Sequence, residues 1–213
     1  MEIVSINVGA RRRLQGRSFD GETGIFKTPV PRAEVGELGL AGDVIVDTKH
    51  HGGVDQAVYL YRREDYEWWA GELGRPLDPG TFGENLTVAG LPDPGLAIGS
   101  RLRFETVVLE VTAPRIPCNT LAARMGDPGF VKRFMQAGRP GIYLRVRTPG
   151  RLTVGERFAL EPYPGPQVTT VEMFRDWHKK LGRPELERYL AVPIDFRSRR
   201  YLEQKLGELT AAS

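Results

Sequence analysis

The one cysteine of the chain, Cys118, lies in a segment that suits a reactive thiol. It falls within residues 114–126, PRIPCNTLAARMG, between two prolines and an apolar run that ends at Gly126. The prolines favour extended backbone before the cysteine, and Asn119 or Thr120 can cap a short helix that the glycine ends. A thiol at a helix start is favoured as thiolate. Cys118 is therefore a candidate nucleophile or soft-metal ligand, and the alternative is an inert, buried cysteine.

A histidine and glycine segment forms the second candidate site. Residues 49–56, KHHGGVDQ, contain two of the three histidines beside a Gly-Gly pair. Glycines allow backbone amides to converge on an oxyanion, and an imidazole can donate to phosphate or bind a metal. The alternatives are a turn with solvated histidines, and a zinc site that joins both histidines to Cys118 without a recognised ligand spacing.

Four further polar residues are candidates for ligand binding. Asn85 opens a strand after a Gly-Glu turn, so it can contact a heterocycle or bond its own backbone. Lys27 and Arg139 lie on predicted loops and Arg115 lies near the cysteine. Together they can neutralise a phosphate if the fold joins them; otherwise each is simply solvated.

Composition restricts the class of protein. The chain has 213 residues, 40% hydrophobic and 27% charged, with a formal charge of +3. This balance is ordinary for a globular protein and does not demand nucleic acid. A single cysteine excludes an internal disulfide and multi-cysteine metal sites. Residues 1–8 alternate like a strand, and no run approaches the roughly 20 apolar residues of a membrane span, so we expect a cytoplasmic protein that does not bind membranes.

Short strands separated by Gly and Pro predict a mainly β fold with helices, closed as a barrel. The expected strands are 2–8, 33–38, 57–61, 85–88, 101–111, 142–147 and 157–160. The expected helices of this part are 63–73, 119–125 and 130–137.

A proline-rich segment at 162–166 predicts a domain boundary. We expect residues 1–163 to form the barrel domain and 164–213 a small three-helix bundle, with helices at 171–181, 184–190 and 195–209. So small a bundle has little core of its own, so we expect it to dock on the main domain or on a second subunit, as in a homodimer. A nucleic-acid-binding role is the alternative for these helices, but their charges are nearly balanced.

Six sequence blocks, taken in order, resemble the MOSC domain family, and more closely its bacterial YiiM-like subfamily. The blocks are 27–30 (KTPV), 39–43 (GLAGD), 50–59 (HHGGVDQAVY), 82–86 (FGENL), 114–118 (PRIPC) and 138–141 (GRPG). The resemblance covers almost the whole chain and implies a MOSC-type β-barrel followed by a three-helix domain. The subfamily is linked to detoxification of N-hydroxylated base analogues.

The resemblance also implies a bound molybdenum-pyranopterin cofactor, which purified protein can lack. Cys118 is then the metal ligand and a catalytic residue. The residues assigned to cofactor binding are Lys27, His51, Gly52, Gly53, Asn85, Arg115 and Arg139. The candidate proton donors are His50, His51 and Asp55, of which His51 and Asp55 are taken as catalytic. Gln56 departs from the lysine expected in this block.

The implied function is reduction of small N-hydroxylated compounds, such as hydroxylaminopurine-type bases, to amines, with electrons from a separate reductase. The cofactor carries the redox chemistry, and the protein supplies ligation, orientation and protons. A sulfur-carrier protein that uses a Cys118 persulfide is the main alternative.

Overall fold

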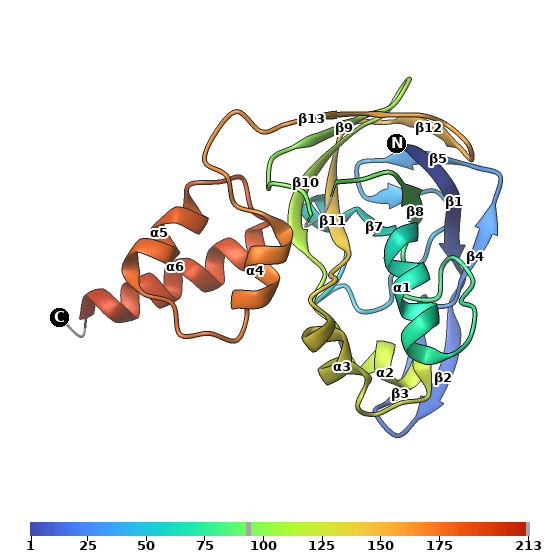
Figure 1. Cartoon of the computed structure of the whole chain (residues 1–213), viewed down its shortest axis with the longest axis horizontal. Coiled ribbons are helices and arrows are strands. Elements are labelled where there is room, and N and C mark those ends of the chain that lie inside the picture. The colour runs from blue at the N-terminus through green and yellow to red at the C-terminus, as the bar shows by residue number, and fades with distance from the viewer. Residues whose placement is uncertain (93–94, 212–213) are drawn as a thin grey trace.

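A curled, mainly antiparallel sheet forms the centre of the molecule, shown by a computed structural model that describes residues 1–92 and 95–211. Its eight strands run in the order β13-β9-β10-β11-β7-β8-β1-β4, and only β7 and β8 pair in parallel (Figure 1). The bounds are β1 Glu2–Gly9, β4 Lys27–Val30, β7 Val58–Arg62, β8 Leu86–Ala89, β9 Arg101–Arg103, β10 Val108–Pro114, β11 Ile142–Thr148 and β13 Ala159–Glu161.

The predicted closed barrel is not found. In the described ranges the edge strands β4 and β13 have no pairing with each other. The segment before β13 meets the start of the chain through an isolated bridge of Arg157 with Glu2 and backbone hydrogen bonds of residues 155–158 with Met1 and Ile3. Strands that could extend the sheet pair elsewhere. β12 (Gly150–Thr153) joins β5 (Arg32–Gly36) and β6 (Gly39–Leu40), while β2 (Arg12–Gly16) and β3 (Phe19–Thr23) form a hairpin.

Burial explains which strands are central. All seven residues of β10 are buried, including polar Glu110 and Thr112, because this strand is covered on both faces. β5 alternates instead, burying only Ala33 and Val35. The expected strand 101–111 is really two strands, because Phe104 and Val107 close a turn between β9 and β10 through a 2.9 Å backbone hydrogen bond.

Helices α1 (Arg63–Leu73), α2 (Asn119–Met125) and α3 (Phe130–Ala137) lie at the predicted positions. Each is followed by a left-handed glycine, as the sequence predicts: Gly74, Gly126 and Gly138. A layer of buried aromatic rings packs these helices on the sheet. Its largest members are Tyr61, Trp69, Phe82, Phe130 and Phe134.

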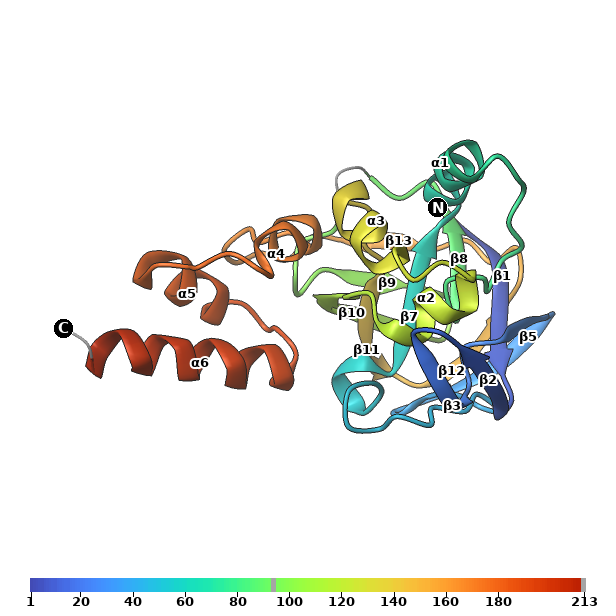
Figure 2. The ribbon, with the colours of Figure 1, turned by 90° about the horizontal axis from the view of Figure 1, so that it is seen from below.

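Three helices also follow residue 164: α4 (Thr170–Asp176), α5 (Arg183–Leu190) and α6 (Phe196–Ala211). Thr169 caps α4 by accepting the Glu172 N–H at 3.1 Å, and this helix ends at Asp176, before the expected residue 181. A three-helix bundle is nevertheless not confirmed, because α4 packs against β10 while α5 and α6 pair with each other and project from the sheet (Figures 1 and 2). Residues 212 and 213 of the expected C-terminal domain lie outside the described residues.

One hydrophobic core connects the two parts of the chain. Leu186, Tyr189 and Leu202 of α5 and α6 belong to the same buried cluster as Leu109 and Val111 of β10. The predicted boundary at residue 163 therefore does not separate two cores.

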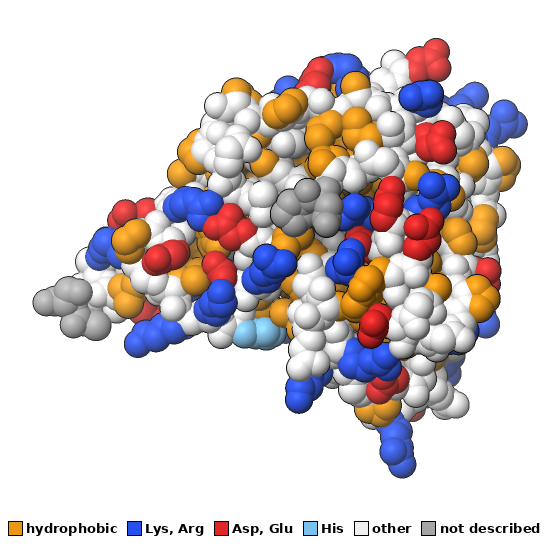
Figure 3. Space-filling model, viewed as in Figure 1, with side chains coloured by type: hydrophobic (Ala, Val, Ile, Leu, Met, Phe, Trp, Pro, Cys, Tyr) orange, Lys and Arg blue, Asp and Glu red, His pale blue; other side chains and the backbone are white. Residues whose placement is uncertain are grey.

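The surface carries interspersed charges. Basic and acidic groups lie side by side over the face shown in Figure 3. None of the helices in the described part of the chain combines the length and the apolar character that crossing a membrane requires.

Candidate functional site

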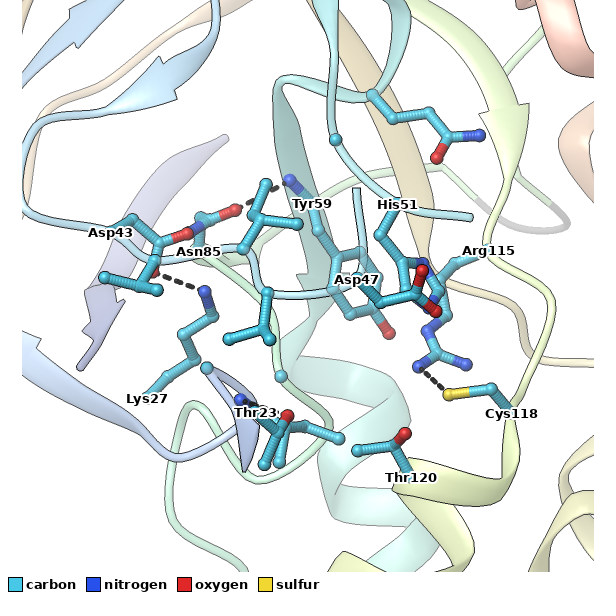
Figure 4. A pocket seen from close by; sticks show the side chains of 18 of the residues that line it. Thr23, Lys27, Asp43, Asp47, His51, Tyr59, Asn85, Arg115, Cys118 and Thr120 are labelled. Atoms are coloured by element: carbon cyan, nitrogen blue, oxygen red, sulfur yellow. Dashed lines mark hydrogen bonds and ion pairs between the residues drawn. The ribbon is translucent and has the colours of Figure 1, made fainter. Parts of the chain in front are cut away.

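A cavity opens where the sheet, the loop of residues 41–53 and the start of α2 meet. Figure 4 shows that side chains from distant segments point into it. The polar residues that line it are Glu22, Thr23, Lys27, Asp43, Asp47, His51, Gln56, Tyr59, Asn85, Arg115, Cys118, Thr120 and Tyr143. The structure thus joins Lys27, His51, Gly52, Asn85, Arg115 and Cys118 of the sequence prediction at one cavity.

Cys118 is itself the N-cap of α2, in place of the predicted Asn119 or Thr120. Its backbone is extended, with φ −129° and ψ 169°, and its carbonyl accepts the N–H groups of Leu121 and Ala122 at 3.0 and 3.2 Å. The side chain is half-buried and faces the cavity (Figure 4). The thiol is therefore placed at the helix start with access to a ligand.

Arg115 supplies the positive charge beside this thiol. Its guanidinium Nη2 donates to Cys118 Sγ at 3.4 Å, and Nη1 donates to the Ile116 carbonyl at 2.7 Å. The residue is only 4% exposed. Among the described residues no carboxylate lies within ion-pair distance of it. A buried guanidinium without a carboxylate requires another anion, which here is the thiolate or a bound ligand.

The electrostatics favour an ionised cysteine. Burial alone would raise the pKa of the Cys118 thiol, but the Arg115 charge, His51 and the Leu121 backbone N–H together lower that pKa to about 5. For Arg115, burial opposes the charge, yet the nearby Cys118 holds its pKa above the ordinary value. At neutral pH the pair is therefore a thiolate beside a guanidinium.

The histidine and glycine turn forms the rim opposite Cys118. His51 Nδ1 lies 3.1 Å from the Tyr143 hydroxyl, within hydrogen-bonding distance. Gly52 has φ +71°, and a Cβ there would approach Ile45 Cδ1 to 2.8 Å, so this position requires glycine. His50 is exposed and pairs with Asp47 at 2.9 Å instead.

Lys27 and Asn85 belong to a network on the other side of the cavity (Figure 4). Lys27 Nζ forms an ion pair with Asp43 Oδ1, and both side chains are only 6% exposed. Asp43 also accepts the Gly9 N–H at 2.7 Å and Asn85 Nδ2 at 2.9 Å. Asn85 Oδ1 accepts the Tyr59 N–H at 3.0 Å. Asp43 therefore neutralises Lys27, which weakens its predicted role as a phosphate anchor.

Arg139 is not in the cavity. It pairs with Asp65 at 2.8 Å and lies over the Trp68 ring at 4.9 Å, beside a separate pocket near α3 and α4. The sequence prediction failed here because the buried carboxylate that fixes Arg139 is 74 residues away.

Asp55 and Gly53 also do not line the cavity. Asp55 pairs with Arg145 at 2.8 Å and accepts the Phe196 N–H at 2.8 Å, so both carboxylate oxygens have structural partners. Gly53 is exposed, with φ +81°. Asp55 is thus not placed to donate a proton at Cys118.

Other cavity residues were missed by sequence reasoning. Asp43 lies in the GLAGD block but was not singled out, and Tyr143 lies on a strand with an ordinary alternating pattern. The buried Tyr59 hydroxyl has no hydrogen-bond partner among the described residues. Gln56 lines the cavity and donates to Asp195 at 3.4 Å. Asp43, Gln56 and Tyr59 lie in the blocks that carry the family resemblance, whereas Tyr143 lies outside them.

The donor set at the cavity excludes some kinds of metal site. In residues 1–92 and 95–211, no group of three or more His, Cys, Asp or Glu side chains is placed to hold a metal ion. The zinc alternative therefore lacks a protein ligand set. A single thiolate beside a guanidinium defines a different class of site, one suited to an anionic ligand or a ligand-bound soft metal.

The chain belongs to the MOSC domain family, whose model matches residues 47–159. This range contains the 47–53 turn, Asn85, Arg115 and Cys118. Relatives of the YiiM-like subfamily agree in sequence and in structure. The Escherichia coli (strain K12) protein YiiM is 32% identical over 159 residues, which cover 73% of this chain and 71% of that protein. The crystal structure of YiiM from Geobacillus stearothermophilus superposes with a TM-score of 0.80 at 26% identity, covering 96% of this chain and 98% of that one.

A longer relative carries an enzyme name. A Gibberella moniliformis protein named "Reductase" is 34% identical over 142 residues, which are 63% of this chain but only 25% of that protein. The name thus belongs to a longer protein, and this chain matches only a quarter of that protein's length.

Proposed function

We propose that the chain is a molybdenum-cofactor-dependent reductase that converts N-hydroxylated compounds, such as hydroxylaminopurine-type bases, to amines. One observation carries the proposal: a half-buried thiolate at Cys118 lies beside a buried Arg115 that has no carboxylate partner among the described residues. MOSC domains are associated with molybdenum cofactors in general, and one relative is named a reductase.

The cavity residues fit such a cofactor. A thiolate is a soft ligand of the kind that suits molybdenum, so Cys118 would hold the metal. Arg115 leaves a positive charge for an anionic pterin phosphate or dithiolene. The Tyr59 hydroxyl, buried without a partner in the described part of the chain, is a further polar contact for the bound group. Lys27 is less suited, because Asp43 already neutralises it.

The protein residues have distinct tasks in this account. When bound, the cofactor supplies the two-electron redox chemistry. Reduction of an N–OH group to an amine consumes two electrons and two protons and releases water, so the site needs a proton path. His51, held by the Tyr143 hydroxyl at 3.1 Å on the cavity rim, is the residue best placed to deliver a proton to the substrate oxygen. Arg115 keeps the Cys118 sulfur ionised.

The proposed electron source is a separate reductase, since a chain with one cysteine cannot release two electrons by forming an internal disulfide. A cytoplasmic location and a homodimer belong to the same proposal. The exposed Phe196 and Tyr201 side chains on α6 are the proposed contacts with a second subunit.

A turnover assay tests the proposal. Protein made in cofactor-competent cells should reduce 6-N-hydroxylaminopurine with an artificial electron donor, and Cys118→Ala should reduce turnover at least ~100-fold, since the metal loses its protein ligand. Arg139→Ala is a matched control, because Arg139 lies outside the cavity, and it should retain activity. Full turnover by Cys118→Ala would refute the ligand assignment.

The sulfur-carrier alternative is favoured by the same low-pKa thiolate, which is accessible enough to carry a persulfide. Intact-mass analysis separates the two functions. One added sulfur on Cys118 with no bound molybdenum would support the carrier and oppose the reductase.

A further inference from the structure

The cavity depends on a long loop with little regular structure. Residues 41–53 connect β6 to the short 3-10 helix η1 (Val54–Gln56) and contain neither helix nor strand. Yet this loop supplies a large share of the cavity wall, including Val44, Ile45, Val46, Asp47, His51 and Gly52. Loops without ladder hydrogen bonds open easily unless side chains fix them. The position of His51 therefore depends on what anchors this loop.

Asp43 and Val44 fix the start of this loop to Gly9, and an arginine from the C-terminal part of the chain anchors residues 48–52. Arg197, in the first turn of α6, donates hydrogen bonds to four backbone carbonyls of this loop. Its Nε donates to Lys49 O at 3.1 Å and its Nη1 to Gly52 O at 2.9 Å. Its Nη2 donates to Thr48 O at 3.1 Å and to His51 O at 3.4 Å. These carbonyls end the turn in which the His51 N–H bonds Asp47 O. Arg197 thus acts as a side-chain cap on the turn.

The start of α6 is itself fixed to the main sheet. The Asp195 N–H donates to Thr112 O at 3.2 Å, and the Phe196 N–H donates to Asp55 Oδ2 at 2.8 Å. Asp195 Oδ1 caps the helix by accepting the N–H groups of Arg197 and Ser198 at 3.1 and 3.2 Å. Since β10 and η1 hold the helix start, the Arg197 side chain reaches the loop from a rigid support.

The Arg197 guanidinium lies over the Phe196 ring, 4.8 Å from the ring centroid. In the described ranges no carboxylate lies within ion-pair distance of its guanidinium, so the loop carbonyls are its hydrogen-bond acceptors. Charged donors to carbonyls are stronger than neutral ones, and a planar fork can reach several acceptors at once. Lysine could reach fewer of these carbonyls simultaneously.

We propose that Arg197 is a positioning residue that couples the C-terminal helices to the cavity by holding residues 48–52 against it. In this role α6 contributes to the proposed reductase without touching the substrate, and the loop keeps His51 and Gly52 opposite Cys118. The inference deepens the proposed function and rests on it only for the catalytic consequence.

Hydrogen–deuterium exchange of the protein without cofactor tests the structural part. Arg197→Ala should accelerate amide exchange of peptides spanning 44–53 roughly tenfold or more, with little change in the strands of the sheet. Arg200→Ala is the matched control, because Arg200 lies on the same helix and is exposed, and it should leave the loop unchanged. Unchanged exchange in the loop, or an equal increase along the whole chain, would overturn the proposal.

Arg197→Lys keeps the positive charge but loses the planar guanidinium that reaches several carbonyls at once. It therefore tests the proposal if the alanine variant does not fold. It should accelerate loop exchange at an unchanged melting temperature. Exchange like that of the wild type in Arg197→Lys, with Arg197→Ala unfolded, would also overturn the proposal.

Turnover then tests the catalytic consequence. In protein loaded with cofactor, Arg197→Ala should retain its molybdenum, because Cys118 and Arg115 are intact, while kcat/KM for 6-N-hydroxylaminopurine falls about tenfold. A loosened loop with unchanged kcat/KM would show that Arg197 does not position the site. If every variant and the wild type lack turnover, the proposed reductase function is refuted. The exchange experiment still tests whether Arg197 holds residues 48–52.

Discussion

At the scale of single residues, the site is an ion pair between a sulfur and a guanidinium. Cys118 owes its reactivity to Arg115, because burial by itself would favour the neutral thiol. An arginine three positions before a cysteine at a helix start is the sequence pattern behind this pair. The sequence did not predict that Arg115 is buried or that Cys118 is the N-cap of α2, because both depend on the path of the chain between β10 and α2.

Alkylation of Cys118 measures this pair directly in protein without cofactor. The rate with iodoacetamide should follow a titration with a midpoint near pH 5 and be level above pH 7. In Arg115→Met the pKa of the thiol should rise, slowing alkylation at pH 7 roughly tenfold. Arg139→Met removes a charge outside the cavity and should leave the profile unchanged; a midpoint above pH 8 in the wild type would contradict the account.

Glu84, a buried carboxyl behind the cavity, should make the stability of the fold depend on pH. Burial raises its pKa, although the Tyr66 hydroxyl, the Gly80 N–H and the Thr87 hydroxyl all donate to it. A raised pKa in the folded state means that stability is fully present below the unfolded pKa and is lost as the pH rises through the folded pKa.

Glu84→Gln should therefore flatten this dependence. Urea unfolding should show the variant more stable than the wild type at pH 7 and no more stable at pH 4. Glu67→Gln, an exposed change on α1, should shift neither value. A wild type whose stability rises steadily from pH 4 to 7 relative to Glu84→Gln would show that Glu84 has the opposite role.

At the scale of elements, local sequence patterns predicted where helices end, but they did not predict contacts between distant segments. The glycines after α1, α2 and α3 end those helices as predicted, because a left-handed C-cap is a local property. The closed barrel was wrong, because β12 pairs with β5 in a second sheet and no local pattern specifies that choice. The sequence analysis assigned Arg139 and Asp55 to the site. Arg139 pairs with Asp65 and Asp55 with Arg145, and these distant partners hold both residues outside the cavity.

Gly52 and Gly53 provide a matched test of the turn. Both have positive φ, but an added Cβ meets Ile45 at 2.8 Å only in Gly52→Ala, whereas the space at Gly53 is open. Gly53→Ala should cost about 2 kcal/mol of the free energy of unfolding, because its φ of 81° and ψ of 175° suit only glycine, and Gly52→Ala should cost more, since it adds a clash to the strain. Chemical denaturation measures both; equal costs would show that Ile45 moves aside freely.

At the scale of the whole molecule, the C-terminal helices are part of the main structure. The sequence predicted three helices after residue 164, and they are present, but it could not show that α4 packs on β10 or that Arg197 reaches the cavity loop. The small size of this segment did indicate that it must dock on something larger. The shared cluster of Leu186, Leu202 and Leu109 shows that the sheet fills this role.

Leu202→Ala tests this continuity. Removing a side chain only 6% exposed should cost about 3 kcal/mol. Because the core is shared, unfolding followed by circular dichroism and by tryptophan fluorescence should remain one coincident transition. Gln204→Ala, an exposed change on the same helix, should cost less than about 0.5 kcal/mol. Two separate transitions would support the predicted division at residue 163 instead.

The central claim is that the Cys118 sulfur holds a molybdenum cofactor, and metal analysis tests it most directly. Mass-spectrometric quantification of molybdenum and pterin should be made on protein purified from cofactor-competent cells and from cells unable to make the cofactor. The account predicts near-stoichiometric molybdenum and pterin in the wild type and Arg139→Ala from competent cells, and little in Cys118→Ala or in any protein from deficient cells. Equal molybdenum in the wild type and Cys118→Ala, or none in the wild type from competent cells, would contradict it.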